Sequence, residues 1–171
     1  MNEHLQTLQQ TLAQDIPITQ HMGITVERYD DKGLILKAPL AGNTNPKGTA
    51  FAGSINALLT LAGWGLIWLI LKELDVVGDV VIQNSSISYL RPVTGDFAAI
   101  CHKPDRDNIA RLKQALKKRG KARMELSAEI YQGDVVVVEF KGRYVMHLSQ
   151  NVISSLSYQG FSQMPRRVHE E

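Results

Sequence analysis

The chain has 171 residues, of which 44% are hydrophobic and 21% are charged, and its formal net charge is +2. This length is typical of a single domain whose core is large enough to fold alone. The single cysteine, Cys101, excludes an internal disulfide and a cysteine-rich zinc site. The first residues lack a basic stretch followed by an apolar one, so we expect no secretory signal and a soluble cytoplasmic protein.

The first part of the chain predicts a short helix and a hairpin. Leucines at helical spacing predict an amphipathic helix over residues 1–14, which Pro17 prevents from continuing. Two segments of alternating apolar and polar residues, joined by a turn, predict the paired strands Ile24–Arg28 and Leu34–Ala38.

The stretch Asn43–Leu71 dominates the sequence. It begins as a polar loop with turn-forming residues and becomes an apolar run without a charged residue. The run is almost long enough to span a membrane, for which about 20 residues are needed. Polar residues within it, such as Asn56 and Thr60, and a strand-rich remainder favour the other interpretation, a buried central helix over residues 51–73. We therefore expect no membrane association.

The rest of the chain predicts four strands with one helix inserted. The strands are expected at Asp79–Tyr89, Phe97–His102, Ala122–Tyr131 and Val135–Leu148, and the helix at residues 105–118. Residues 1–148 would form the domain, and residues 149–171 a loosely held or partner-bound tail.

This order of elements predicts an α+β fold in which an antiparallel sheet of about six strands wraps around the long apolar helix. A sheet that half-encloses a helix leaves open edges, and a second subunit usually protects such edges. We therefore expect a homodimer or a dimer of dimers.

The predicted arrangement resembles the hot-dog fold, whose members act on acyl thioesters of coenzyme A or acyl carrier protein. The loop NPKGTAFAG, residues 45–53, is similar to the N-x-x-G-x-x-H-G-G motif of hot-dog thioesterases. The runs NPKGTAFAGSINALLTLAGWGL and QNSSISYLRPVTGD resemble a family labelled "putative thioesterase", and the resemblance covers roughly residues 5–148. Members of that family stand alone or are fused to an acetyltransferase domain, and they include malonyl-acyl-carrier-protein decarboxylases.

The sequence departs from the thioesterase motif at the residues that hydrolysis would need. Phe51 stands at the histidine position, and Thr60 stands where such enzymes commonly carry a carboxylate. No Asp or Glu occurs between Asp31 and Glu73. Hydrolysis requires an activated water, so its base would have to come from elsewhere in the dimer, such as Asp96, Glu125 or His102.

Decarboxylation of a malonyl thioester suits this composition better, because it needs stabilisation of an enolate rather than a base. The resemblance implies Asn45 as the catalytic residue, and its alternative role is to cap a turn. The start of the helix offers free backbone N–H groups. Candidate substrate-binding residues are Gly48, Phe51, Gly53, Ser54, Ile55 and Leu58. The two glycines have a purely conformational alternative role, and Ser54 could instead be the helix N-cap.

Basic residues are concentrated in one segment, since nine of the nineteen Lys and Arg lie between Lys103 and Arg123. The segment could bind the acidic acyl carrier protein through Arg111, Lys117, Lys118 and Arg119, or it could be a solvated helix face. It contains no aromatic residue, so we do not expect nucleic-acid binding. The histidines show no metal-ligand spacing, and we expect no metal and no cofactor.

Three hypotheses about function follow from these observations. The first is a lyase that decarboxylates malonyl-acyl carrier protein to acetyl-acyl carrier protein and so supplies primer for fatty acid biosynthesis. The second is a thioesterase acting on acyl-coenzyme A or acyl-acyl carrier protein. The third is a module that binds acyl thioesters without turning them over.

Overall fold

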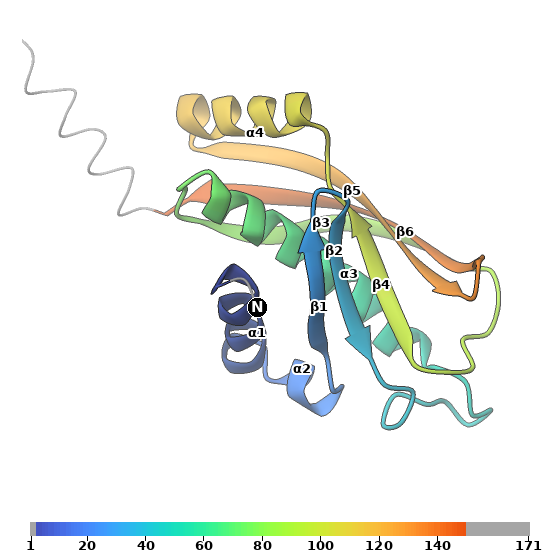
Figure 1. Cartoon of the computed structure of the whole chain (residues 1–171). Coiled ribbons are helices and arrows are strands. Elements are labelled where there is room, and N and C mark those ends of the chain that lie inside the picture. The colour runs from blue at the N-terminus through green and yellow to red at the C-terminus, as the bar shows by residue number, and fades with distance from the viewer. Residues whose placement is uncertain (1–2, 150–171) are drawn as a thin grey trace, which may run out of the picture.

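The computed structural model describes residues 3–149, which form an antiparallel sheet wrapped around a long helix (Figure 1). The helices are α1 (Glu3–Asp15), α2 (Ile18–His21), α3 (Ala52–Glu73) and α4 (Arg106–Arg119). The strands are β1 (Thr25–Asp30), β2 (Gly33–Ala38), β3 (Gly78–Tyr89), β4 (Phe97–His102), β5 (Lys121–Gln132) and β6 (Val135–Leu148).

The sheet has six strands in the order β1-β2-β4-β5-β6-β3, and every neighbouring pair is antiparallel. The strands β1 and β3 therefore lie at its two edges. The predicted α+β architecture, with six strands around one apolar helix, is confirmed.

Helix α3 is the core of the domain. Taken alone, it is long and apolar enough to cross a membrane, but 67% of its most hydrophobic window is buried by the rest of the described chain. Small residues allow the sheet to approach it closely. A Cβ atom at Gly63 would lie 2.2 Å from the Tyr144 hydroxyl oxygen, and that hydroxyl donates a hydrogen bond to the Thr60 carbonyl. The apolar run is thus the central helix of a folded domain.

Two smaller helices complete the core. Helix α1 buries Leu5, Leu8 and Leu12 and is tied to β1 by Gln9, whose side chain accepts a 2.7 Å bond from the Val26 N–H. Helix α4 begins at the N-cap Asp105 and ends at Gly120, which adopts φ +63°.

Most differences from the predicted elements lie at their ends. Helix α1 extends to Asp15, α3 begins at Ala52 because Phe51 is its extended N-cap, and β1 runs two residues beyond Arg28. Ends of elements depend on local hydrogen bonds that periodicity does not encode. The predicted tail, beyond Ser149, lies outside the described residues.

Candidate functional site

The loop before α3 is held in place by Asn43. The Asn43 side-chain amide is buried and donates 2.8 Å bonds to the carbonyls of Met22 and Pro39. The backbone carbonyl of Asn43 accepts a 2.7 Å bond from the Phe51 N–H, and the Ala50 N–H donates to the Val93 carbonyl. The base of the loop is thereby fixed to α2, to β2 and to the segment after β3, so the start of α3 has a defined position.

Both the oxygen and the nitrogen of the Asn45 side-chain amide form hydrogen bonds within this loop. Its Oδ1 atom accepts a 2.9 Å bond from the Lys47 N–H. Its Nδ2 atom donates a 2.8 Å bond to the Thr49 hydroxyl and a longer bond, 3.3 Å, to the Ala50 carbonyl. Asn45 therefore shapes the turn, as its alternative role required, and one of its two amide hydrogens makes only a weak bond.

The first turn of α3 has free hydrogen-bond donors. Phe51 is the N-cap and makes no side-chain bond, and the first intrahelical donor is the Ile55 N–H, which bonds the Phe51 carbonyl. The N–H groups of Ala52, Gly53 and Ser54 have no partner within the described residues. These N–H groups lie at the positive end of a helix dipole, so the turn can bind an oxyanion.

Phe51 and Gly53 are packed against each other at this end. A Cβ atom at Gly53 would lie 2.3 Å from the Phe51 ring, so the absence of a side chain lets the ring fold over the helix start. Gly48 adopts φ +74°, and its surroundings are open, so its freedom of conformation serves the turn.

The remaining predicted contact residues lie in different surroundings. Ser54 is the third residue of α3 and not its N-cap, which is Phe51. Ile55 and Leu58 are buried in the hydrophobic core, 3% and 0% exposed, instead of facing solvent beside Phe51. The structure thus brings Asn45, Phe51 and Gly53 to one end of α3, while the two aliphatic residues support that end from within.

Tyr89 is a residue of this region that the sequence analysis did not select. Its hydroxyl donates a 3.1 Å bond to the Ala52 carbonyl, which joins the end of β3 to the start of α3. Burial raises the pKa of the Tyr89 phenol, so the hydroxyl stays protonated at neutral pH. Phe51 and Tyr89, which lie at the start of α3, are 53% and 46% exposed, and Leu90, which follows Tyr89 in the chain, is 52% exposed.

The three suggested bases lie in different places. Asp96 is nearest to the loop, because its carboxylate accepts a 2.8 Å bond from the Leu40 N–H. Glu125 bonds Arg143 at 2.9 Å, and His102 lies 3.3 Å from Glu129; both are on the outer face of the sheet. The thiol of Cys101 is no candidate nucleophile, because burial raises its pKa to about 12.

The four basic residues proposed for carrier-protein binding do not all point the same way. Arg111 and Arg119 line a groove between α4 and β5, and together with Lys118 they also line a neighbouring hollow. Lys117 lines neither hollow and lies on the other flank of the helix. The groove also contains Lys121 and Arg123 of β5, which the sequence analysis counted in the basic segment without assigning them a role.

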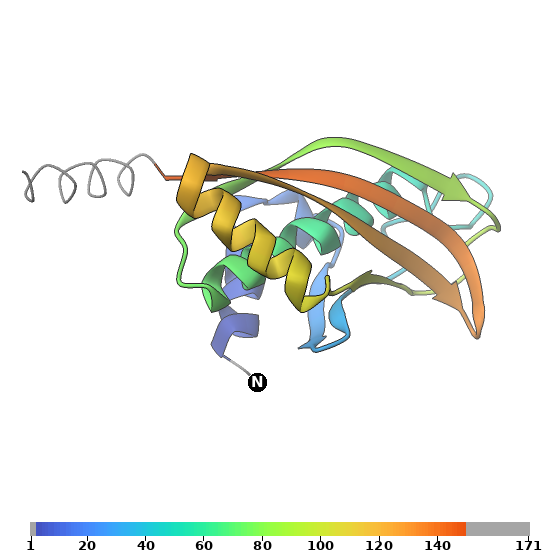
Figure 2. The same cartoon turned by 90° about the horizontal axis from the view of Figure 1, so that it is seen from above.

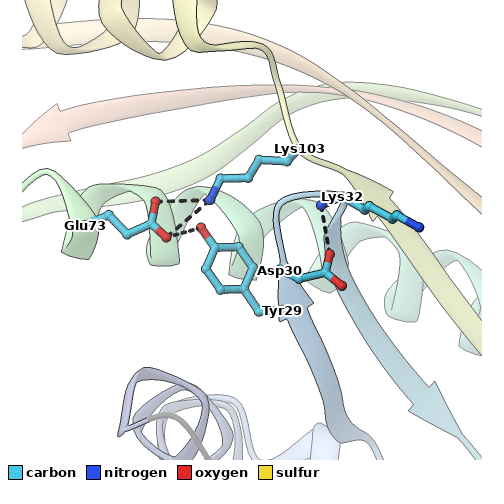
Figure 3. A network of polar contacts seen from close by, with 5 residues as sticks. All are labelled: Tyr29, Asp30, Lys32, Glu73 and Lys103. Carbon is cyan, nitrogen blue, oxygen red and sulfur yellow. Dashed lines mark hydrogen bonds and ion pairs between the residues drawn. The ribbon is translucent and has the colours of Figure 1, made fainter.

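A polar cluster lies at the opposite end of α3 (Figure 3). Glu73, in the last turn, accepts a 2.6 Å bond from the Tyr29 hydroxyl and two 3.2 Å bonds from the Lys103 ammonium group. That ammonium group also lies 4.4 Å from the centre of the Tyr29 ring. Burial and the Glu73 carboxylate raise the pKa of Tyr29 far above its ordinary value. The cluster ties β1, α3 and the end of β4 together.

Comparison with known proteins assigns this architecture to a family. Residues 5–148 match the family model described as "Putative thioesterase (yiiD_Cterm)". The chain belongs to this family. The family has the hot-dog fold, so the resemblance noted in the sequence is confirmed.

Solved structures agree with this membership. A protein of unknown function from Chlorobaculum tepidum TLS is 35% identical, with a TM-score of 0.81 over 84% of this chain and 94% of that one. A putative thioesterase from Shewanella oneidensis is also 35% identical, with a TM-score of 0.78 over 87% and 100% of the two chains. A thioesterase from Haemophilus influenzae shares the fold at 17% identity, with a TM-score of 0.66 over 84% and 90%. The family is thioesterase-like, which implies acyl thioester substrates.

Proposed function

We propose that the protein decarboxylates malonyl-acyl carrier protein to acetyl-acyl carrier protein and so provides primer for fatty acid biosynthesis in the cytoplasm. The observation that supports this reaction is the start of α3, where three backbone N–H groups have no partner among residues 3–149. No Asp, Glu or His occurs between Lys32 and Lys72. The site can therefore stabilise an oxyanion, while its own loop and helix offer no base to activate water.

In this reaction the bond between the malonyl carboxylate carbon and the neighbouring methylene carbon breaks. Its electron pair forms an enolate on the thioester oxygen, and carbon dioxide leaves. The free N–H groups of Ala52, Gly53 and Ser54 would bind the enolate oxygen, and a proton from water would then complete the acetyl group. The apolar ring of Phe51 would limit the access of water to the malonyl carboxylate.

Asn45 has a defined part in this proposal. Its second amide hydrogen makes only the 3.3 Å bond to the Ala50 carbonyl, so the thioester oxygen can replace that weak acceptor. The first amide hydrogen and Oδ1 would continue to hold the turn through Thr49 and Lys47. Asn45 is then both a catalytic donor and part of the loop that positions it.

A homodimer formed through β3 would complete the site. The strand β3 is a 12-residue edge with exposed apolar residues, Val81 and Ile82 among them, and long unprotected edges of this kind pair readily. On the adjacent face of α3, Trp64 donates a 3.0 Å bond to the Val80 carbonyl and is only half-buried, as are Thr60 and Trp68. A second copy would cover this edge and the exposed side chain of Phe51.

Hydrolysis of the acyl thioester is the second candidate function, and the description of the family favours it. Asp96 is the most suitable base within one chain, since its carboxylate lies at the base of the Asn45 loop. Decarboxylation leaves the thioester intact and releases carbon dioxide, whereas hydrolysis releases a free thiol.

The two reactions are separated by measuring both products in one incubation. Malonyl-acyl carrier protein and malonyl-coenzyme A would each be incubated with the protein, and free thiol and carbon dioxide would be measured together. We expect carbon dioxide without thiol from the carrier-protein substrate. Stoichiometric thiol would support the thioesterase instead, and tight binding without either product would support a module that only binds acyl thioesters.

A further inference from the structure

A basic groove lies between α4 and the beginning of β5, away from the Asn45 loop. This α4–β5 groove encloses about 740 Å³. Its lining residues include Arg111, Ala115 and Arg119 of α4 and Lys121, Arg123 and Met124 of β5. Figure 2 shows α4 lying alongside the first half of β5, with β6 and β3 beyond it.

The groove exists because β4 and β5 separate. They pair only where Ala99–Cys101 meet Ala128–Ile130, so residues 121–127 have a strand neighbour on one side only, namely β6. Helix α4 fills the gap from the other side with the buried side chains of Leu112 and Leu116. Within residues 3–149, the outer part of the gap stays open and forms the groove.

The cations that line this groove are not neutralised within the described chain. Arg111, Arg119, Lys121 and Arg123 each lie more than 4.0 Å from every carboxylate oxygen of residues 3–149, since none of the ion pairs found there includes them. Glu125, the one carboxylate that lines the groove within the described part of the chain, is bonded to Arg143 on the outer face of the sheet. The groove therefore favours a ligand with several negative charges.

The arrangement of these cations fits an acidic helix better than a nucleotide. Arg111 and Arg119 are eight residues apart on α4, which corresponds to two helical turns or about 12 Å. A second helix lying beside α4 repeats its side chains at the same interval, so its carboxylates can face both arginines. Among residues 3–149, no aromatic ring on which a base could stack lines the groove, and the Asn108 amide within it is already bonded to Asp105.

In the proposed β3 dimer, the register of the sheet would bring this groove near the site of the partner. Lys121, His147 and Asp79 are paired across β5, β6 and β3, so the groove and the start of β3 share one end of the sheet. Tyr89, at the other end of β3, is bonded to the start of α3. When two β3 edges pair around a two-fold axis perpendicular to the sheet, they are antiparallel, and each Tyr89 end meets the Asp79 end of the partner.

We infer that the α4–β5 groove of one subunit binds an acidic helix of the acyl carrier protein and presents its thioester to the Asn45 site of the other subunit. This inference rests on the proposed function and on the β3 dimer. Lys121 and Arg123 then belong to the same binding surface as Arg111 and Arg119. One subunit binds the carrier protein, and the other subunit catalyses the reaction.

Binding is tested with unacylated carrier protein, so that the result does not depend on turnover. Reversing two charges in the groove, in Arg119→Glu/Arg123→Glu, should weaken carrier binding about a hundredfold or more. The matched control, Arg106→Glu/Lys113→Glu, reverses two exposed cations on the other flank of α4 and should bind like wild type. Equal binding by both double variants would overturn the inference.

The assignment to different subunits is tested with a mixed dimer, purified through two different affinity tags. One subunit carries Asn45→Ala and a native groove; the other carries Arg119→Glu/Arg123→Glu and a native Asn45. We expect both parent homodimers to be nearly inactive and the mixed dimer to recover about half of the wild-type rate, since one site of two has both parts. An inactive mixed dimer that still binds carrier protein would show that each groove serves its own subunit.

The small-molecule substrate separates the remaining outcomes. If groove reversal impaired turnover of malonyl-coenzyme A as much as that of the carrier-protein substrate, the groove would bind the phosphates of a nucleotide and the inference would be wrong. If the Asn45→Ala homodimer kept full activity, the proposed role of Asn45 would be wrong. The binding measurement would still show whether the groove binds the carrier protein.

Discussion

The two ends of helix α3 are built in opposite ways. At its start, three N–H groups lack partners within the described chain, and no charged side chain lies in the first turn. At its end, Glu73 is bonded to Tyr29 and to Lys103, and these bonds join three segments of the chain (Figure 3). Helix α3 is therefore anchored at its end, and the polar groups at its start are available to bind a ligand.

This contrast is typical of a binding site carried on a stable element. Unbonded donors at a helix start forgo stabilisation that a Ser or Asp cap would supply, about 1 kcal/mol for a typical cap. The polar cluster and the buried face of α3 hold the helix in place, so the free end stays fixed in position. Changes at the start of α3 should therefore affect activity, and changes at its end should affect stability.

The largest effect on activity is expected from Ala52→Pro. Ala52 is the first residue of α3, where proline is well tolerated, and Phe51 already has the extended backbone that precedes proline, with φ −68° and ψ 131°. The substitution removes one free N–H group and little else. We expect acetyl-carrier formation to fall about 100- to 1000-fold if this N–H binds the enolate oxygen, measured as kcat/KM.

Thermal unfolding provides the control for this variant. The melting temperature of Ala52→Pro should stay close to that of wild type, and Ala52→Gly, which keeps the N–H, should retain most of the activity. Full activity of the proline variant would remove this N–H from the mechanism.

A smaller loss of activity is expected from changes at Asn45, where catalysis and loop structure must be separated. Asn45→Asp keeps the acceptor for the Lys47 N–H but loses both amide donors and adds a negative charge near the enolate, so we expect about a 100-fold loss of kcat. Thr49→Val removes one of the loop bonds of Asn45 and leaves its amide in place. Thr49→Val should lose only a few fold; an equal loss in both variants would indicate a purely structural Asn45.

At the other end of α3, the expected effect is on stability alone. Tyr29→Phe removes the hydroxyl that donates to Glu73, and the loss of such a bond costs about 1–2 kcal/mol because the acceptor is charged. Urea unfolding should show this loss, while kcat/KM stays within twofold of wild type. A variant of unchanged stability but reduced activity would contradict the division of roles between the two ends.

The smallest expected effect is the pH dependence of the stability that the Tyr29–Glu73 hydrogen bond contributes. The ordinary pKa of a tyrosine phenol is 10.0, and burial together with Glu73 raises the pKa of Tyr29 well above it in the folded protein. The contribution of Tyr29 is therefore complete below about pH 10 and decreases at higher pH, because only the unfolded chain then loses the proton readily. The stability difference between wild type and Tyr29→Phe should shrink above pH 10 and stay constant between pH 6 and 9.

Much of the fold could be predicted from the sequence because its patterns are local. The charge-free run around Leu58 and the alternation in the later strands identify the central helix and the sheet, and both are observed. The motif around Asn45 and Phe51 correctly indicated a loop that leads into the helix. The start of that helix at Ala52, with Phe51 as its N-cap and Ser54 inside the first turn, depends on hydrogen bonds that the motif does not contain.

Other parts of the site depend on contacts between distant segments, which one sequence does not reveal. Ile55 and Leu58 are as apolar as a pocket wall requires, but in the folded chain they are buried in the hydrophobic core. Tyr89 reaches Ala52 only because β3 returns alongside α3. Lys121 and Arg123 join Arg119 in a groove only because β4 and β5 separate, and that separation is a property of the sheet.

The central claim, enolate formation with retention of the thioester, is tested most directly by intact-mass spectrometry of malonyl-acyl carrier protein that is incubated with the protein in deuterated water and then returned to ordinary water. The return removes deuterium from N–H and O–H groups but not from the acetyl carbon. The account predicts loss of carbon dioxide and an acetyl group that carries one deuteron from solvent, with the carrier thiol still acylated. Carrier protein with a free thiol, or a malonyl thioester unchanged after prolonged incubation, would contradict it.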